Sequence, residues 1–473
     1  MDTPNNLFRE VLILGAGPSG LAAANVLTKA GTHLLVVEGN STVGGLSRTI
    51  QHHGFRFDLG GHRFLTDNKK LEHLVRDVLK GELLTVTRSS KILFHNKYYD
   101  YPLEPWNALS GLGFFTVIKI IFDYLLTQVK SRFWPTKPVS LEDWIVCKFG
   151  RTMFTIFFKD YSEKVWGINC DEIAEEWAAQ RIQGMSLFKA IKDAFVPIKD
   201  KEVRTLTRQF LYPVQGFGEI SEGLHLAIKK DNKNDVLTSA RIVGIHHADQ
   251  SIESITVQCG KDSQVYGANE YICSIPITAV VNLLDPPAPP EILEAALNLK
   301  FRDLIIVTVM IDRDRVTDQT WIYIPDPDVP FGRIHEPKNW SKDMAPSGKT
   351  HLVTEYFCFK SDNLWSQTDE ELTELTVNHL QNLGFIKDDE VFDSVVLRIP
   401  NAYPLFEVDY LKHYEQVFHY LEGFQNLHLI GRAGKFRYYN TDHAMESGMA
   451  AAEDIIVRNQ SSDRNPLNVL ISV

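Results

Sequence analysis

Cysteine is scarce in this chain of 473 residues, and the few cysteines lie scattered. The five cysteines include no C-x-x-C pair. This spacing argues against a disulfide framework, a cysteine-bound zinc ion and a dithiol redox site. We therefore expect a protein of a reducing compartment, and the sequence offers no metal site.

Basic residues are also in deficit. Lysine and arginine number 49 against 60 aspartates and glutamates, which gives a formal net charge of −11. General nucleic-acid binding needs a basic surface, so we expect no nucleic-acid partner. The first ten residues, MDTPNNLFRE, contain neither a basic segment nor a long apolar run. We therefore expect no secretory signal and a cytoplasmic protein.

A second dinucleotide-binding motif is missing as well. The stretch QGFGEI at 215–220 offers two glycines, but no second G-x-G-x-x-G follows a strand-like run. A dedicated NAD(P)H domain is therefore not expected. An external reductant such as NAD(P)H stays open as a partner.

One such motif is complete, near the start of the chain. In VLILGAGPSGLAAANVL the apolar run 11–14 predicts a buried strand, and the glycines lie in the turn that opens an alanine-rich helix. Such glycines let the backbone approach a pyrophosphate, which the helix N-terminus attracts. A second apolar run, 34–37, ends at Glu38, whose carboxylate suits a ribose hydroxyl and disfavours the 2′-phosphate of NADP. The predicted contacts are Gly15, Gly17, Pro18, Ser19, Gly20 and Glu38.

Two following segments favour FAD over NAD. GNSTVGGLSRT at 39–49 and GFRFDLGGHRF at 54–64 each carry a glycine pair, which lets the chain pass close to a long, flat ligand. Arg48 can offer its guanidinium to a diphosphate. A plain NAD fold needs neither segment. The predicted FAD contacts here are Gly45, Leu46, Arg48, Gly61 and His62.

The end of the chain repeats the opening pattern. LHLIG at 427–431 predicts a strand, and a glycine-bearing loop and the helical run HAMESGMAAAEDIIV follow it. The predicted fold is therefore α/β: a Rossmann-type FAD-binding domain of the glutathione-reductase kind, discontinuous in sequence, with an inserted α+β substrate domain. The predicted boundaries are 1–90, 205–280 and 405–460 for the FAD domain, 91–204 for a helical part and 281–404 for an antiparallel-sheet part of the substrate domain, and 461–473 for a tail.

The apolar stretch LSGLGFFTVIKIIFDYLLTQV at 109–129 raises the question of a membrane. It contains Lys119 and Asp123, which lie four residues apart and can pair on one helical face. Two charges at mid-depth are expensive in lipid, so a transmembrane span is the least favoured interpretation. We expect a buried or half-buried helix, and a contact with a membrane surface is the next interpretation.

The order of the motifs resembles that in the flavin amine oxidase and protoporphyrinogen-oxidase-like superfamily. G-x-G-x-x-G, the acidic strand end, GG-x-S-R and FD-x-GGH follow one another, and GRAGKFRYYNTDHAMESGMAAAEDI at 431–455 is similar to the closing motif. The resemblance implies bound FAD, with a helix N-terminus directed at the flavin to stabilise negative charge on the reduced ring. The closing residues that it assigns to the cofactor are Gly431, Arg432, Asn440, Asp442, His443 and Met445.

Blocks in the middle of the chain are similar to the UDP-galactopyranose mutases, especially the longer eukaryotic-type ones. In order they are DYPLEP, LEDWIVCKFG, YSEKVWGIN, WAAQRI, GRIHEPKNWS, NAYPLF and YNTDHAM. The resemblance implies that Arg181 and Arg333 hold a substrate diphosphate, a role that suits a planar and permanently charged group. It also implies that His62 lies beside the flavin. The implied substrate contacts are Tyr101, Trp166, Tyr403 and Tyr438.

This likeness implies an enzyme that interconverts the pyranose and furanose forms of a nucleotide sugar through reduced FAD, with no net oxidation. His62, Arg181 and Arg333 would be its catalytic residues. The same blocks are also similar to bacterial proteins described only as FAD-dependent oxidoreductases, so other interpretations stay open. One is a net oxidoreductase that removes hydride from an amine, a polyene or a porphyrinogen-like substrate. The other is an FAD-bearing binding protein without catalysis.

Overall fold

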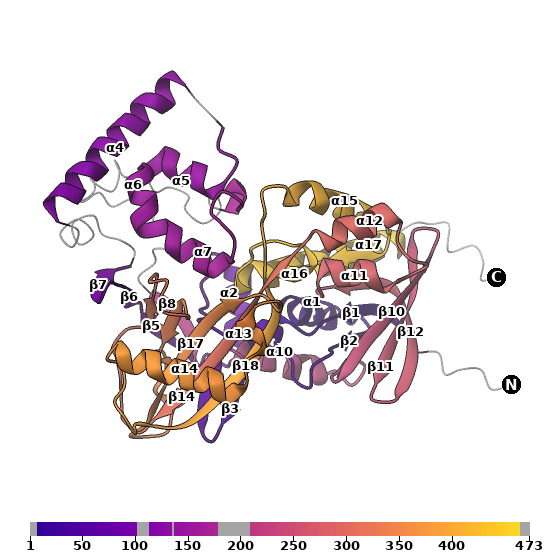
Figure 1. Cartoon of the computed structure of the whole chain (residues 1–473). Helices are drawn as coiled ribbons and strands as arrows, with labels where there is room; N and C mark the ends of the chain where they lie inside the picture. The colour runs from indigo at the N-terminus through magenta and orange to yellow at the C-terminus, as the bar shows by residue number, and fades with distance from the viewer. Residues whose placement is uncertain (1–6, 102–112, 135–136, 178–208, 464–473) are drawn as a thin grey trace, which may run out of the picture.

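The computed structural model describes residues 7–101, 113–134, 137–177 and 209–463. Two large sheets and a group of helices account for most of these residues (Figure 1). Each sheet combines segments that lie far apart in the sequence.

The larger sheet is mostly parallel at its centre. Its strands are β1 (Phe8–Leu14), β2 (Leu34–Val37), β9 (Asp235–Leu237), β10 (Ala240–Ala248), β11 (Ser251–Cys259), β12 (Asp262–Cys273), β13 (Leu284–Asp285) and β19 (Leu427–Leu429). Their order is β13-β10-β11-β12-β1-β2-β9, and β19 also pairs with β12. The strands predicted at 34–37 and after residue 427 are confirmed, and the one at 11–14 is the carboxyl half of β1.

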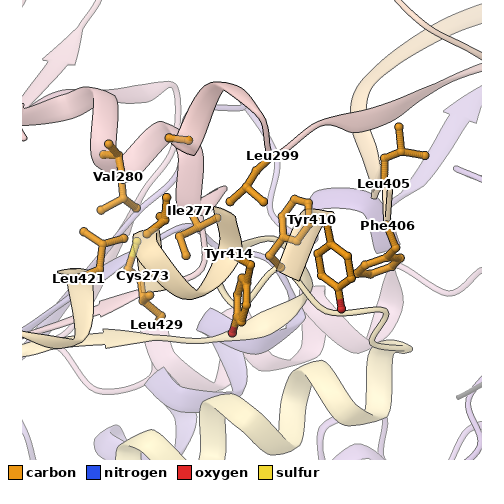
Figure 2. Close-up of a cluster of buried hydrophobic side chains, with 14 of the residues drawn as sticks. Cys273, Ile277, Val280, Leu299, Leu405, Phe406, Tyr410, Tyr414, Leu421 and Leu429 are labelled. Carbon is orange, nitrogen blue, oxygen red and sulfur yellow. The ribbon is translucent and has the colours of Figure 1, made fainter. Parts of the chain in front are cut away.

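Helices cover both faces of this sheet. Successive side chains of a strand point to opposite faces, so one strand contributes residues to two cores. Val11 and Ile13 pack into one core, whereas Leu12 and Leu14 belong to the other. The first core includes side chains of α1 (Pro18–Lys29), α10 (Glu219–Lys229) and α17 (Thr441–Asp463); the second includes those of α11 (Ile277–Leu283), α12 (Pro290–Leu297) and α15 (Tyr410–Glu422). Figure 2 shows part of the second core, where Ile277 and Val280 lie with Tyr414 and Leu421. The predicted α/β fold with a Rossmann-type domain, discontinuous in sequence, is confirmed.

The second sheet is mainly antiparallel and has the order β18-β14-β17-β16-β15-β6-β7. Its strands are β6 (Ser90–Phe94), β7 (Lys97–Asp100), β14 (Phe301–Ile311), β15 (Trp321–Tyr323), β16 (Arg333–His335), β17 (Thr350–Cys358) and β18 (Val391–Pro404). One face packs on α14 (Asp369–Asn382), and the other packs on the hairpin of β3 (Thr49–His52) and β4 (Phe55–Asp58). Residues 90–100 therefore join this sheet, although the predicted helical part begins at residue 91. The domain boundaries themselves stay a prediction.

Shorter elements connect these layers. They are α2 (Lys69–Val78), the paired strands β5 (Leu83–Thr87) and β8 (Gln209–Pro213), α13 (Asn363–Ser366) and α16 (Gly431–Gly434). The start of α14 shows why such elements begin where they do. The Thr368 hydroxyl accepts a hydrogen bond from the Glu371 N–H (3.2 Å), and the Glu371 carboxylate accepts one from the Thr368 N–H (2.8 Å). This reciprocal cap satisfies two N–H groups that a helix start otherwise leaves unpaired.

The helical group lies beside the two sheets, with α4 projecting at the upper left of Figure 1. Its members are α4 (Phe114–Phe133), α5 (Leu141–Phe149), α6 (Arg151–Met153) and α7 (Asp160–Trp166), and a π-helical turn (Phe154–Lys159) joins the last two. The helix predicted at 109–129 is present from Phe114 on and is half-buried along one side, where Ile120 is its one fully buried residue, but most of its apolar residues are exposed. Asp123 accepts a hydrogen bond from the Thr152 N–H (2.6 Å). None of the described helices is long and apolar enough to cross a membrane.

Candidate functional site

The glycine turn lies between β1 and α1. Gly15 has a φ of +103°, and a Cβ at Gly20 would overlap the Gly15 carbonyl oxygen, so both positions need glycine. Gly17 differs, because a Cβ there would meet no atom within 4 Å. Gly17 caps α1, Pro18 follows, and no side chain caps the helix N-terminus. Unpaired N–H groups and open space therefore meet at one place, which suits a diphosphate.

The segment after β2 borders the same space. Glu38 is buried, and its carboxylate accepts hydrogen bonds from the Ala16 N–H (2.8 Å) and from the backbone (2.9 Å) and side-chain (2.7 Å) N–H groups of Asn40. A carboxylate has about four acceptor positions, so capacity for a ribose hydroxyl remains. A Cβ at Gly45 would lie 3.4 Å from the Gly17 Cα. We call residues 15–20, Glu38 and residues 44–48 the nucleotide cradle.

Arg48 closes the cradle. Its Nη1 lies 3.5 Å from the Gly45 carbonyl oxygen, and no described carboxylate lies within salt-bridge distance of it. Burial lowers the pKa of Arg48, and the charge of Glu38 opposes this shift. A half-buried guanidinium of this kind, together with the open glycine turn, fits the diphosphate of FAD.

The closing loop reaches the cradle from the other end of the chain. Gly431 has a φ of +72°, and a Cβ there would lie 2.5 Å from the Ser19 Oγ. A Cβ at Gly448 of α17 would overlap the Ser19 carbonyl oxygen, so α17 packs directly on α1. Because of this packing, the N-terminus of α17 lies beside the cradle.

A polar cavity lies next to the cradle, since the hydroxyl of Thr441, in its lining, is 3.5 Å from the hydroxyl of Ser47 in the cradle. It is lined by the loop after β4, by β16 and β18, and by the loop between α16 and α17. The lining residues are Gly60, Gly61, His62, Arg63, Leu65, Arg333, Tyr403, Arg432, Tyr438, Asn440, Thr441 and Asp442. We call His62, Arg333, Tyr403, Arg432 and Tyr438, with Glu355 behind them, the pocket wall.

Arg333 is held by a fully buried carboxylate. Its Nη2 lies 2.6 Å from the Glu355 Oε2, and the two residues are direct partners in the pairing of β16 with β17. Burial opposes the charge of Arg333, but the neighbouring Glu355 holds the pKa of Arg333 above its ordinary value. Arg333 Nε has no hydrogen-bond partner among the described residues. The guanidinium is therefore charged and fixed in orientation, and it retains an unused donor.

Two tyrosines and a second arginine form the part of the wall next to Arg333. The rings of Tyr403 and Tyr438 stack at 6.2 Å, and the Arg432 guanidinium lies 5.3 Å from each ring centre. The Tyr403 hydroxyl accepts a hydrogen bond from Arg333 Nη2 (3.2 Å), which leaves its own O–H to donate. Trp166 is buried behind these rings, with ring-centre distances of 6.5 Å to Tyr403 and 6.2 Å to Tyr438. It positions the tyrosines and is not among the cavity-lining residues.

His62 faces the cavity as a neutral imidazole. Its Nδ1 lies 3.1 Å from the Gly60 carbonyl oxygen, which can only accept, so Nδ1 carries the hydrogen. Burial and the neighbouring Arg432 lower the pKa of His62 to about 4. Near neutral pH its Nε2 is therefore a hydrogen-bond acceptor.

A second group of aromatic residues lies on the far side of Arg333. The Tyr323 ring is 4.6 Å from Tyr101 and 5.7 Å from Tyr161, and the Arg88 guanidinium lies 4.8 Å from the Tyr101 ring. Burial raises the pKa of both Tyr161 and Tyr323, so these phenols stay protonated. Tyr101, a predicted substrate contact, thus lies near Arg333 through Tyr323 and does not line the cavity itself.

The remaining predicted site residues have varied positions. Arg181 lies outside the described residues. Met445 is fully buried in the core, His443 is half-buried on α17, and Leu46 packs beneath the second sheet. The sequence analysis missed Glu355, Tyr323, Tyr161 and Arg63. Tyr161 and Arg63 lie within quoted blocks, whereas Glu355 and Tyr323 carry no sequence signal, because only strand pairing brings them to the site.

Comparison with known proteins identifies the family. The model of the flavin-containing amine oxidoreductases matches residues 18–456, and the chain belongs to this family. It is therefore an FAD-dependent enzyme, as the motifs predict, and the described cradle fits this cofactor.

Individual relatives are more distant. All-trans-retinol 13,14-reductase of Danio rerio is 34% identical over 76 residues, which cover 16% of this chain and 12% of that protein. Chloroplastic protoporphyrinogen oxidase of Nicotiana tabacum is 20% identical over 435 residues, or 85% of this chain and 77% of that protein. A crystal structure of reduced UDP-galactopyranose mutase has a TM-score of 0.82 at 21% identity, over 98% of this chain and 97% of that one. At this identity the structural likeness establishes the fold alone.

Proposed function

We propose that this enzyme interconverts the pyranose and furanose forms of a nucleotide sugar, with no net oxidation. The observation that carries the proposal is the cationic, phenol-rich pocket wall. The cavity lining carries three arginines, Arg63, Arg333 and Arg432, against one carboxylate, Asp442, and this excess of positive charge favours anionic ligands over a protonated amine. An apolar polyene would bury these polar groups without partners, which is unfavourable. The structural likeness to UDP-galactopyranose mutase supports the same interpretation.

Each residue of the pocket wall has a role in this reaction. Bound, reduced FAD would supply the nucleophile that displaces the nucleoside diphosphate from the sugar. Arg333, fixed by Glu355, donates hydrogen bonds to the departing diphosphate. Tyr403 donates its O–H to the same group, and His62 accepts a hydrogen bond from a sugar hydroxyl through Nε2.

Arg181 completes the proposed diphosphate clamp, by its match to the mutase motif. Arg432 and the N-terminus of α17 lie at the junction of cavity and cradle. We assign them to the cofactor, where positive charge and a helix dipole stabilise an anionic ring. An external reductant such as NAD(P)H would prepare the enzyme for turnover.

A net oxidoreductase is the alternative, and one observation favours it. The match to protoporphyrinogen oxidase spans 85% of this chain. Such an enzyme would remove hydride from a neutral substrate, and the two arginines would then serve only the cofactor.

The first test is the visible spectrum of the FAD-loaded protein during titration with UDP and then with dTDP. We expect a saturable shift of the flavin band. Arg333→Ala and Arg181→Ala should each weaken nucleotide binding about tenfold to hundredfold, because each removes charge-assisted hydrogen bonds. Arg241→Ala, an exposed arginine on β10, is the matched control and should leave the titration unchanged.

The outcomes separate the two functions. A flavin band that is indifferent to both nucleotides at millimolar concentration would overturn the diphosphate clamp and favour the oxidoreductase. If nucleotide binds, incubation of the reduced enzyme with a UDP-hexose tests the isomerisation directly. Formation of the other ring form without consumption of reductant supports the mutase.

A further inference from the structure

The helix α4 exposes its apolar side. The exposed fraction is 85% for Phe115 and 62% for Phe122, against 1% for Ile120 on the opposite side. Spacings of three, four and seven residues place the exposed side chains in one stripe along the helix. This α4 stripe consists of Phe115, Ile118, Phe122, Leu125, Leu126 and Val129.

The inward side of α4 combines apolar and polar contacts: Ile120 is buried in the core and Tyr124 packs against it, while two polar side chains attach the helix to its neighbours. Asp123 accepts a hydrogen bond from the Thr152 N–H (2.6 Å), and Gln128 donates one to the Cys147 carbonyl (3.2 Å). These contacts attach the helix to α5 and α6. A helix that only covered a core would turn most of its apolar residues inward, whereas most apolar residues of α4 are exposed. The outward apolar side of α4 is therefore suited to contact with an apolar partner outside the protein.

Basic side chains border the stripe. Lys119 and Lys130 are eleven residues apart, which is about three helical turns, so they lie on the same edge of α4. Arg132 follows in the last turn, and Trp134 is exposed just beyond it. The acidic residue of the helix, Asp123, is turned inward. This local positive charge stands in a protein whose formal net charge is −11.

We infer that α4 docks the enzyme on an anionic lipid bilayer, lying flat with its stripe among the acyl chains. An apolar stripe with basic borders and a tryptophan at its end is the pattern of an interfacial helix. A second copy of the chain fits less well, because a symmetric pairing of two such helices would bring like charges together.

The proposed membrane docking involves helices that also border the pocket, and it does not depend on which reaction the enzyme catalyses. The helices α4 to α7 form one group, and α7 supplies Tyr161 and Trp166 near the pocket. Binding through α4 would therefore attach to the membrane the helical group that also borders the pocket through α7, whichever substrate the enzyme takes.

Vesicle co-sedimentation of the full-length, FAD-loaded protein tests this inference. We expect binding to vesicles containing phosphatidylglycerol and much weaker binding to pure phosphatidylcholine. The triple variant Phe115→Ser/Phe122→Ser/Leu126→Ser should lower the partition coefficient about tenfold or more. Lys119→Gln/Lys130→Gln/Arg132→Gln should abolish the preference for anionic vesicles. The matched control replaces Leu226, Val265 and Leu297 with serine, since these are similarly exposed apolar residues on other elements.

Three results would overturn the inference. One is wild-type protein that stays in the supernatant with both kinds of vesicle. Another is a control variant that loses binding as much as the stripe variant does. The third is a wild-type protein that binds no vesicles and sediments as a dimer in analytical ultracentrifugation, while the stripe variant sediments as a monomer. That result would identify a second copy of the chain as the occupant. Flavin content and melting temperature of each variant show whether it is folded.

Discussion

The nucleotide cradle and the pocket wall are adjacent, but they are built in opposite ways. The cradle relies on backbone groups and on glycines whose side-chain space is needed by a ligand or a neighbouring chain segment. The pocket wall relies on side chains that come from the loop after β4, β16, β17, β18 and the loop before α17. The difference shows that a short stretch of sequence can specify the cradle, whereas the pocket wall forms only when distant segments of the chain pack together.

The largest expected effect is at Glu355. Replacement by glutamine leaves the Arg333 charge in the protein without its partner, which should lower the free energy of unfolding by about 3–5 kcal/mol. Urea denaturation at saturating FAD measures this change. The double variant Arg333→Gln/Glu355→Gln should recover much of the loss. A single variant as stable as the wild type would mean that the wall does not depend on this ion pair.

His62 predicts a pH dependence of stability. Its pKa is about 4 in the folded protein against an ordinary value of 6.5. The stability that the neutral imidazole contributes is therefore complete above pH 6.5 and is lost as the pH falls toward 4, by up to about 3 kcal/mol. The measurement is the unfolding free energy of the wild type and of His62→Gln at saturating FAD, from about pH 7.5 to about pH 4. The difference between the two proteins gives the contribution of His62. A difference that is constant over the range contradicts the prediction.

The cradle glycines separate folding from cofactor binding. Gly20→Ala inserts a Cβ against backbone and should destabilise the protein by about 1–3 kcal/mol. Gly17→Ala meets no protein atom, so it should leave stability in denaturant unchanged but weaken FAD retention, measured as flavin absorbance per protein after dialysis. Gly39→Ala also meets no atom within 4 Å and serves as control. Equal flavin retention in the Gly17 and Gly39 variants would show that the cradle does not hold the diphosphate at Gly17.

The smallest effect concerns Tyr403. Tyr403→Phe keeps the ring that stacks on Tyr438 and removes only the hydroxyl, so the fold should be unchanged. Loss of one donor should weaken UDP binding by about 1 kcal/mol, or roughly fivefold. Tyr414→Phe is the control, because Tyr414 lies on α15 with its ring buried in the core and does not line the cavity. If UDP affinity falls equally in both variants, the Tyr403 hydroxyl does not point to the ligand.

The sequence alone determined the cofactor domain. Local spacing and hydrophobic runs predict its main parts: the glycine turn, the strand that ends at Glu38, and the strand and helix near the end of the chain. These signals are readable because a phosphate-binding turn is made by neighbouring residues and by backbone groups, whose geometry depends on the glycines themselves.

Tertiary structure alone decided the pocket wall and the role of α4. Glu355 meets Arg333 only through strand register, and Trp166 is buried behind the tyrosines only because α7 packs against β18 and the closing loop. The apolar run at 109–129 predicts a helix but not its orientation, and the structure turns the apolar side outward. Periodicity states which residues share a face, whereas long-range contacts, which a sequence pattern does not contain, decide what that face meets.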